Sequence, residues 1–414
     1  MWIVRQFLVV AVVGAWLGAA APAAEPRVEL GNEVLAAGGF KELRGMRLGL
    51  ITNPSGVNRQ LQSTMDVLRA APGVKLVALF APEHGISGDV PAGDKVESRT
   101  DPRTGLPVYS LYGATRKPTP AMLQGLDALV YDLQDTGCRS YTFISTMGEA
   151  MAACGEAGLK FIVLDRPNPL GGQRVEGPRV AEKFRSFVSR WDVPYVYGLT
   201  CGELARMINA RGWIKKPCQL TVVPLRGWQR GMVWRDTGLP WVPTSPHVPH
   251  GESPLFQVAT GMLGEIGGAS IGIGYTLPFQ CVAAPKVDPQ ALAARLNGCG
   301  LPGVKFQPVT YKPYYGEFKD QIVGGVQVHF TDPASAPLTA INYFALAALK
   351  EVAGRDLFAE AVKASKKFDM FDKVNGTDAT RLALQAGQPA PEIVESWKPG
   401  EEQFRQERKK YLLY

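Results

Sequence analysis

The stretch "VKLVALFAPEHGISGD", residues 74–89, joins an apolar run to a pair of ionisable side chains. Residues 74–80 are apolar at nearly every position, which is typical of a strand buried on both faces of a parallel sheet. Glu83 and His84 then stand between a proline and a glycine. A plain turn needs Gly, Pro, Asn or Asp, and not two adjacent ionisable side chains. The stretch therefore predicts a buried strand that ends at a site of chemistry.

The same strand pattern recurs on both sides of this stretch. The further runs are "MRLGLIT" (46–52), "LDALVYD" (126–132), "LKFIVLD" (159–165) and "CQLTVVP" (218–224). Helical patterns lie between the strands, at 63–71, 119–126, 142–158 and 200–212. Such alternation predicts an α/β fold with a Rossmann-like, doubly wound and mostly parallel sheet.

The second part of the chain has a different character. Residues 226–285 are rich in Gly, Pro and Trp, which predicts an irregular segment that packs over the first domain. The remainder mixes strand and helix patterns, as an α+β domain does. A chain of 414 residues is long enough for two domains. We predict a Rossmann-like domain at 25–228 and a smaller α+β second domain at 229–414 that closes a cleft.

The N-terminus has the pattern of a secretory signal peptide. Arg5 precedes an apolar core, and small residues follow it in "LGAAAPAAEP". We expect cleavage after residue 24 and a periplasmic or secreted protein; an uncleaved membrane anchor is the alternative. No later segment reaches the roughly 20 apolar residues of a membrane span.

Charge and cysteine content limit the function classes. The net charge is +7, but the basic residues are scattered, which argues against a nucleic-acid groove. The six cysteines include no CxxC pair, so a zinc ribbon or thioredoxin motif is excluded. Export permits disulfides, and single buried thiols fit the spacing equally well. The oligomeric state cannot be inferred from these features.

Polar side chains follow the other predicted strands as well. The residues at these strand ends are Asn53, Asp132, Asp135, Arg139, Tyr141, Asp165, Arg166 and Asn168. In an open parallel sheet, ligands bind beyond the carboxyl ends of the strands, where these residues should converge with Glu83 and His84. Any single Asp after a strand is more often a helix cap or a turn residue, so the prediction rests on the convergence.

Several other kinds of site are disfavoured. The chain has no Gly-rich phosphate loop, no HExxH motif and no GxSxG elbow, so neither a nucleotide cofactor nor a nucleophilic serine is expected. His247 and His250 lie three apart in a Pro-rich loop, which is a weak zinc signal because a closed site wants four ligands. We predict no cofactor and no metal. What remains is carboxylate chemistry, in which a buried carboxyl group protonates a leaving oxygen.

Long stretches of the chain resemble the NamZ-type exo-β-N-acetylmuramidase family. They are "FAPEHGISGDVPAGDKVESRTDPRTGLPVYSLYG", "KPTPAMLQGLDALVYDLQDTGCRSYTFISTM", "KFIVLDRPNPLGG", "YGLTCGELARMIN", "DTGLPWVPTSP" and the terminal "KKYLLY". The resemblance covers nearly all of the chain after residue 24. It implies a Rossmann-like domain, a smaller second domain and a cleft between them.

The resemblance also implies an activity and roles for residues. Members of the family remove N-acetylmuramic acid from the non-reducing ends of peptidoglycan fragments. Glu83 would be the general acid, with His84 as its catalytic neighbour. The expected substrate-binding residues are Asn53, Arg99, Tyr112, Asp132, Asp135, Arg139, Tyr141, Asp165, Arg166, Asn168 and His247.

One stretch departs from the family pattern. Relatives carry a segment resembling "SEGRGTTRPFE", whereas residues 270–280 here read "SIGIGYTLPFQ". Ile271, Ile273, Leu277 and Gln280 stand where charged residues are expected. The difference predicts a changed subsite, with muramic acid bound poorly if an arginine there pairs with its lactyl carboxylate. The alternative is therefore a non-catalytic or retuned relative that binds cell-wall glycan fragments.

Overall fold

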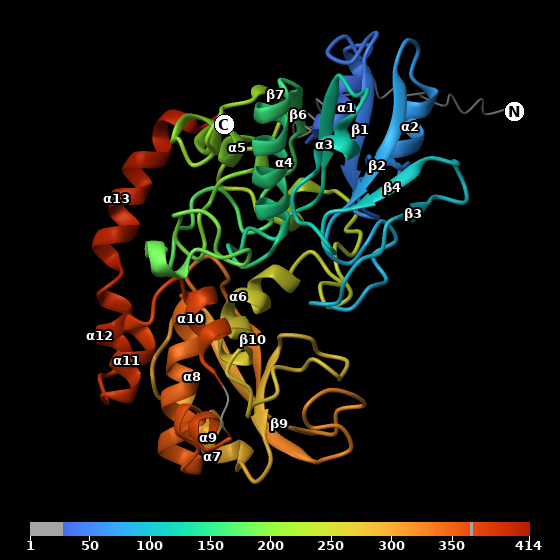
Figure 1. Cartoon of the computed structure of the whole chain (residues 1–414). Coiled ribbons are helices and arrows are strands. Elements are labelled where there is room, and N and C mark those ends of the chain that lie inside the picture. The colour runs from blue at the N-terminus through green and yellow to red at the C-terminus, as the bar shows by residue number, and fades with distance from the viewer. Residues whose placement is uncertain (1–27, 365–366) are drawn as a thin grey trace, which may run out of the picture.

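The structure, a computed structural model, describes residues 28–364 and 367–414, so the predicted signal peptide at 1–24 lies outside the described residues. A seven-stranded sheet has the order β3-β4-β2-β1-β5-β6-β7 (Figure 1). Its strands are β1 (Arg47–Thr52), β2 (Lys75–Ala81), β3 (Arg99–Thr100), β4 (Pro107–Ser110), β5 (Ala128–Asp132), β6 (Lys160–Leu164) and β7 (Gln219–Val223). All neighbours are parallel except β3 and β4. The predicted parallel sheet is confirmed.

Helices cover both faces of this sheet. They are α1 (Gly31–Ala37), α2 (Thr64–Ala70), α3 (Pro120–Leu123), α4 (Phe143–Ala157) and α5 (Cys201–Ala210). Alternate residues of the central strands point to opposite faces. Leu50 and Val130 pack with α1 and α2, while Tyr131 and Phe161 pack with α4 and α5. The sheet is therefore doubly wound, and its central strands are buried on both faces as their apolar runs predict.

The strand order reverses between β1 and β5, from which the chain winds outward in opposite directions. The loops after these two strands diverge there, and such a switch point is where open α/β sheets bind ligands. Strands β3 and β4 were not predicted because both are short, β3 is exposed and β4 is only partly buried, so they lack a continuous apolar run.

The second domain is smaller and mixes strands with helices. Its antiparallel sheet, in the order β8-β10-β9, contains β8 (Cys281–Ala284), β9 (Val304–Tyr311) and β10 (Val323–Phe330). Its helices are α6 (Ser253–Gly264), α7 (Pro289–Asn297), α8 (Leu338–Ala353), α9 (Leu357–Lys363), α10 (Asp369–Asn375), α11 (Ala379–Gln385), α12 (Ala390–Glu395) and α13 (Lys398–Arg408). The predicted α+β second domain is confirmed. Figure 1 shows α6 between the two sheets.

Two segments tie the domains together. The irregular segment after β7 packs on the first domain, where Trp228 and Trp234 join Val28 and Leu30 in a small apolar cluster. Helix α13 runs back from the second domain along the outside of the first (Figure 1). Its Arg408 donates to the carbonyl of Tyr197 at 2.9 Å. The division after residue 228 stays a prediction.

The cysteines and helices answer two further sequence questions for residues 28–364 and 367–414. All six cysteines are free thiols, five of them buried. No helix in this part of the chain is long and apolar enough to cross a membrane.

Candidate active site

A cavity of about 370 Å³ lies between the two domains. The loops after β2 and β5 line one side, and α6 with the loop after it lines the other. Five of the predicted site residues meet here: Glu83, His84, Tyr112, Tyr141 and His247. The cavity thus lies at the predicted edge of the sheet and is completed by the second domain.

The Glu83 carboxylate is held by hydrogen bonds to both of its oxygens. The backbone N–H of Gly93 donates to Oε1 at 2.9 Å, and Thr142 Oγ1 donates to Oε2 at 2.5 Å. Thr142 is the residue before α4, so the loop after β5 fixes a side chain that follows β2. Glu83 is only 7% exposed. Two donors at a buried carboxyl group suit its ionised form, which only accepts hydrogen bonds.

His84 has a backbone conformation that is rare for a side-chain-bearing residue. Its φ is 71°, in the left-handed region, and Gly85 follows at 79°. The ring Nδ1 donates to the carbonyl of Val90 at 2.9 Å, so a neutral ring keeps Nε2 as an acceptor. Strained backbone of this kind persists where the surroundings enforce it, often at functional sites.

Two tyrosines and a second histidine complete this part of the lining. Burial and the nearby charge of Glu83 raise the pKa of Tyr112 to about 12. Burial also raises the pKa of Tyr141, whose hydroxyl donates to Thr244 Oγ1 at 3.4 Å. Burial and then the nearby His84 lower the pKa of His247, whose Nε2 lies 2.8 Å from the hydroxyl of Tyr315. At neutral pH these groups are uncharged hydrogen-bonding partners.

The other eight predicted substrate-binding residues do not line this cavity. They are Asn53, Arg99, Asp132, Asp135, Arg139, Asp165, Arg166 and Asn168. Arg99 is exposed and donates to Ser87 Oγ at 2.7 Å. The remaining seven are buried and bond to protein groups, because loops at a sheet edge leave backbone amides and carbonyls that need partners. Their predicted contact with sugar stays a prediction.

Two buried networks show what these side chains do instead. Asp132 pairs with the Arg166 guanidinium and accepts from Thr64, which joins β5 to α2. Asp165 accepts from Thr200 Oγ1 at 2.7 Å and from Tyr414 at 2.8 Å, which anchors the C-terminus. Burial raises the pKa of Asp165 to about 6.

Asp135, Asn53 and Asn168 brace loops in the same way. Tyr197 and the Gly137 N–H both donate to Asp135 Oδ1 at 2.7 Å, while burial raises the pKa of Asp135 to about 7. Asn53 Nδ2 donates to the carbonyl of Thr244 at 2.9 Å. Asn168 Nδ2 donates to the carbonyl of Leu199 at 2.9 Å. These residues support the site from behind its lining.

The sequence analysis missed Glu265, which faces the same cavity from the second domain. It is the first residue after α6. The Glu265 side chain is exposed to the open cavity, although many protein atoms surround its carboxyl group. Burial and then the charge of Glu83 raise its pKa to about 7. Only its position directly after Gly264 at a helix end could have marked it, and that signal is weak.

The wall opposite Glu83 is largely apolar. Ile271 and Ile273 line it, as the departure at 270–280 predicts, together with Phe279, Met370 and Val374. Ile271 also packs into the core of the second domain. Among the described residues no arginine or lysine lines the cavity, whereas two carboxyl groups do.

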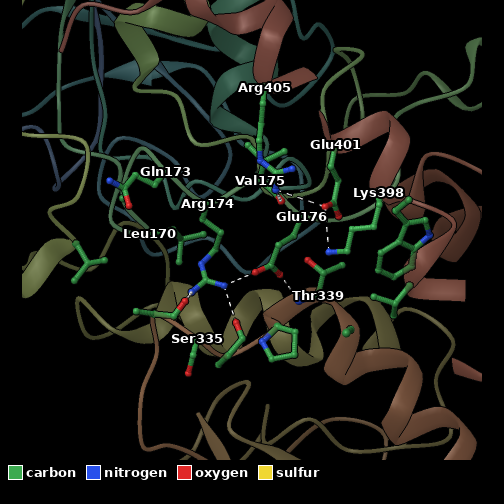
Figure 2. Close-up of a pocket in the computed structure, with 18 of the residues that line it drawn as sticks. Leu170, Gln173, Arg174, Val175, Glu176, Ser335, Thr339, Lys398, Glu401 and Arg405 are labelled. Carbon is green, nitrogen blue, oxygen red and sulfur yellow. Dashed lines mark hydrogen bonds and ion pairs between the residues drawn. The ribbon is translucent and has the colours of Figure 1, made fainter. Parts of the chain in front are cut away.

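A second cavity between the domains has a different character. It measures about 410 Å³ and is rich in charged side chains (Figure 2). Arg174 pairs with Glu176, and Lys398 and Arg405 lie near Glu401 at 3.4 and 3.6 Å. Because these charged side chains pair with one another, we interpret the second cavity as a structural joint between the two domains.

In residues 28–364 and 367–414 no group of three or more His, Cys, Asp or Glu side chains is placed to hold an ion. His247 bonds to Tyr315.

Comparisons with known proteins match this architecture. Sequence profiles described as "Exo-beta-N-acetylmuramidase NamZ", N-terminal and C-terminal, match residues 48–252 and 257–414. The peptidoglycan β-N-acetylmuramidase NamZ of Bacillus subtilis is 41% identical over 392 residues, which are 95% of this chain and 92% of that protein.

Two crystal structures of DUF1343 family proteins from Bacteroides fragilis are similar as well. One is 48% identical with a TM-score of 0.88, and the other is 28% identical with a TM-score of 0.70. Both alignments cover 94% of this chain and 99% of the other. The resemblance seen in the sequence is confirmed. The chain therefore belongs to the NamZ family of exo-β-N-acetylmuramidases and is a glycoside hydrolase.

Proposed function

We propose that the protein is an exo-acting glycosidase that hydrolyses terminal β-linked N-acetylmuramic acid, or a related aminosugar, from peptidoglycan fragments. The reaction takes place in the interdomain cavity, with Glu83 as a catalytic carboxylate and His84 beside it. The observation that carries this proposal is the pair of hydrogen bonds that fixes the Glu83 carboxylate at the carboxyl end of β2. The relative from Bacillus subtilis, whose name states this activity, supports the choice of substrate.

The size and lining of the cavity fit a sugar residue. A volume of about 370 Å³ is in the range of small-molecule sites. Hydroxyl groups of Tyr112, Thr142 and Ser245 and the amide of Gln257 offer hydrogen bonds, while Ile273 and Phe279 offer apolar contact.

The replacement Glu83→Gln tests the proposal. We expect a loss of turnover of about 10²-fold or more, because a catalytic carboxylate contributes roughly 10²–10⁴-fold and an amide cannot act as a general acid or base. The measurement is sugar release from para-nitrophenyl β-N-acetylmuramic acid. Glu97→Gln, at an exposed position in the same loop region, is the matched control and should keep full activity. Near-normal activity of Glu83→Gln would contradict the assignment.

A retuned aminosugar specificity is the second candidate. The apolar wall and the lack of a lining arginine or lysine among the described residues favour it, since a free lactyl carboxylate finds no cation there. The para-nitrophenyl β-N-acetylglucosamine analogue, assayed in parallel, separates the two. Release from the glucosamine substrate alone indicates retuning, and binding of fragments without release indicates a non-catalytic relative.

We also propose that the protein is exported, on the basis of the pattern at residues 1–24. The N-terminus of protein recovered from the periplasm or medium of an expressing bacterium checks this. Retention of full-length protein in the cytoplasm would contradict it.

A further inference from the structure

Glu265 brings a second carboxyl group into the cavity that holds Glu83, from the opposite domain. Helix α6 presents Gln257, Gly261 and Gly264 to the cavity, and Glu265 follows at the end of this face. Gly261 and Gly264 come four and seven positions after Gln257, so these three residues share one side of the helix. Glu265 comes four positions after Gly261 and therefore follows on the same side. Since Glu83 follows a strand of the first domain, the pair spans the domain interface.

Nothing in the described part of the chain stabilises a charge on Glu265. No protein donor in this part contacts its carboxyl group, and no basic side chain contributes to its titration. It also follows the C-terminal end of α6, where the helix dipole is negative and disfavours an anion. With Glu83 nearby, two like charges would repel each other. The Glu265 carboxyl group therefore has no partner among the described residues and is free to contact a substrate in the cavity.

The two carboxyl groups have opposite environments. Glu83 accepts from Gly93 at 2.9 Å and from Thr142 at 2.5 Å, which suits a carboxylate. Glu265 lacks such donors, and burial with the charge of Glu83 raises its pKa to about 7. Titratable pairs whose environments differ in this way divide into an acid and a base.

We propose that Glu265 is the proton donor of the hydrolysis and that Glu83 is its ionised partner, an inference that rests on the proposed function. The Glu265 carboxyl proton moves to the glycosidic oxygen as the bond from that oxygen to C1 breaks. The bonding electron pair stays on this oxygen, which leaves as an alcohol. Water adds its oxygen to C1 and gives a proton to Glu83, and proton exchange with solvent restores both carboxyl groups. Glu83 thereby takes the base role in place of the acid role expected from the sequence.

The leaving group provides the first test. Glu265→Gln should lower turnover of the disaccharide N-acetylmuramic acid–N-acetylglucosamine by about 10²–10⁴-fold, because its sugar alcohol needs a proton to leave. A dinitrophenyl glycoside, whose phenolate leaves without a proton, should lose less than about tenfold. Glu252→Gln, at an exposed glutamate before α6, is the matched control. An equal loss with both substrates would overturn the assignment, since it would indicate a role other than proton donation.

The pH dependence provides the second test. A general acid must keep its proton, so activity of the unaltered enzyme should fall as the pH rises through about 7. This fall in activity on the alkaline side of the pH profile, its alkaline limb, should disappear in Glu265→Gln. In a ¹³C NMR titration of the unaltered protein, the Glu265 carboxyl should titrate near pH 7, and Glu83→Gln should shift it to lower pH by removing the adjacent charge.

The outcomes separate this inference from the proposed function. An unchanged alkaline limb in Glu265→Gln, or a Glu265 carboxyl that titrates near its usual value of 4.5, overturns the inference while hydrolysis by the unaltered enzyme stands. Failure of the unaltered enzyme to hydrolyse any of these glycosides contradicts the proposed function itself. Folding is checked independently, because Glu265→Gln removes an unfavourable charge and should melt no lower than the unaltered protein above pH 7.

Discussion

Arg139 is fully buried and joins four segments of the chain. Its guanidinium donates to the carbonyls of Pro178, Val193 and Val374 at 2.6, 2.7 and 2.8 Å, and to Ser189 Oγ at 3.1 Å. Within residues 28–364 and 367–414 it has no carboxylate partner, and burial lowers its pKa to about 10. A buried cation that donates to three carbonyls positions the backbone behind the site.

Replacement of Arg139 by Met should therefore lower the stability of the fold more than it weakens substrate binding. We expect the free energy of unfolding to fall by about 3 kcal/mol or more, because hydrogen bonds to a charged group contribute roughly 1.5–3 kcal/mol each and three carbonyls would lose their donor. Urea unfolding measures the change. Arg103→Met removes an exposed pair with Asp66 and a contact with Met65 Sδ, and it is the control. A raised KM with unchanged stability would instead support the predicted sugar contact.

At the scale of an element, helix α6 shows how small residues shape a site. Gly261 and Gly264 lie on the face that lines the cavity, and both leave it open. A Cβ atom built at Gly261 would lie 3.6 Å from the hydroxyl of Tyr195, an ordinary contact. A Cβ at Gly264 would meet Ile271 Cδ1 at 2.6 Å, which requires that side chain to shift. The helix pattern predicts none of this, since glycine is costly within helices.

Gly261 therefore offers a way to fill the cavity without disturbing the core. Gly261→Ala should fold normally and gain up to about 1 kcal/mol of stability from helix propensity. Gly261→Leu should extend a side chain into the space for substrate and raise KM about tenfold or more, since a displaced methylene group alone alters binding by roughly 1–3 kcal/mol. Substrate-concentration series for both variants check this. Equal KM values for the two would place the sugar elsewhere.

At the scale of the whole molecule, the cavity exists only because two domains are held in register. The joint in Figure 2 contributes to this, as Arg174 pairs with Glu176 and donates to the carbonyl of Ala336 at 2.7 Å. Glu176 in turn accepts from the backbone N–H of Thr339 at 2.8 Å. Both side chains are largely buried, at 13% and 17% exposure. Breaking one partner would leave the other charge unpaired.

Arg174→Ala should loosen this joint and weaken catalysis at a distance. We expect a loss of about 2–4 kcal/mol in the free energy of unfolding, in the range for breaking a largely buried pair. Guanidinium unfolding measures this loss. A lower kcat in this variant, which retains Glu83, would indicate that the two domains have shifted relative to each other. Arg235→Ala, which removes an exposed pair with Asp236, should change stability by less than about 1 kcal/mol. An unaltered unfolding curve for Arg174→Ala would show that the joint is not structural.

The sequence by itself determined the elements and the edge at which the site lies. Apolar runs such as 74–80 are buried on both faces, so their pattern specifies central strands directly, and the first-domain helices begin with recognisable caps such as Thr119 and Thr200. Glu83 and His84 were predicted because an ionisable pair is unusual where a buried strand ends, and both line the cavity. The residues at the other strand ends were harder to interpret, since a buried Asp that braces a loop and one that binds sugar have the same local pattern.

Only the tertiary structure decided which of these side chains share a cavity. Asp132, Asp165 and Arg139 turn to backbone and side-chain partners behind the lining, while Tyr112 and His247 reach the cavity. The sequence did not identify Glu265 because it lies in the second domain, far from Glu83 along the chain. Its proposed role depends on the charge of Glu83, which lies near Glu265 only when the two domains meet. Local patterns specify what a residue's neighbours in sequence require, whereas a catalytic environment depends on neighbours in space.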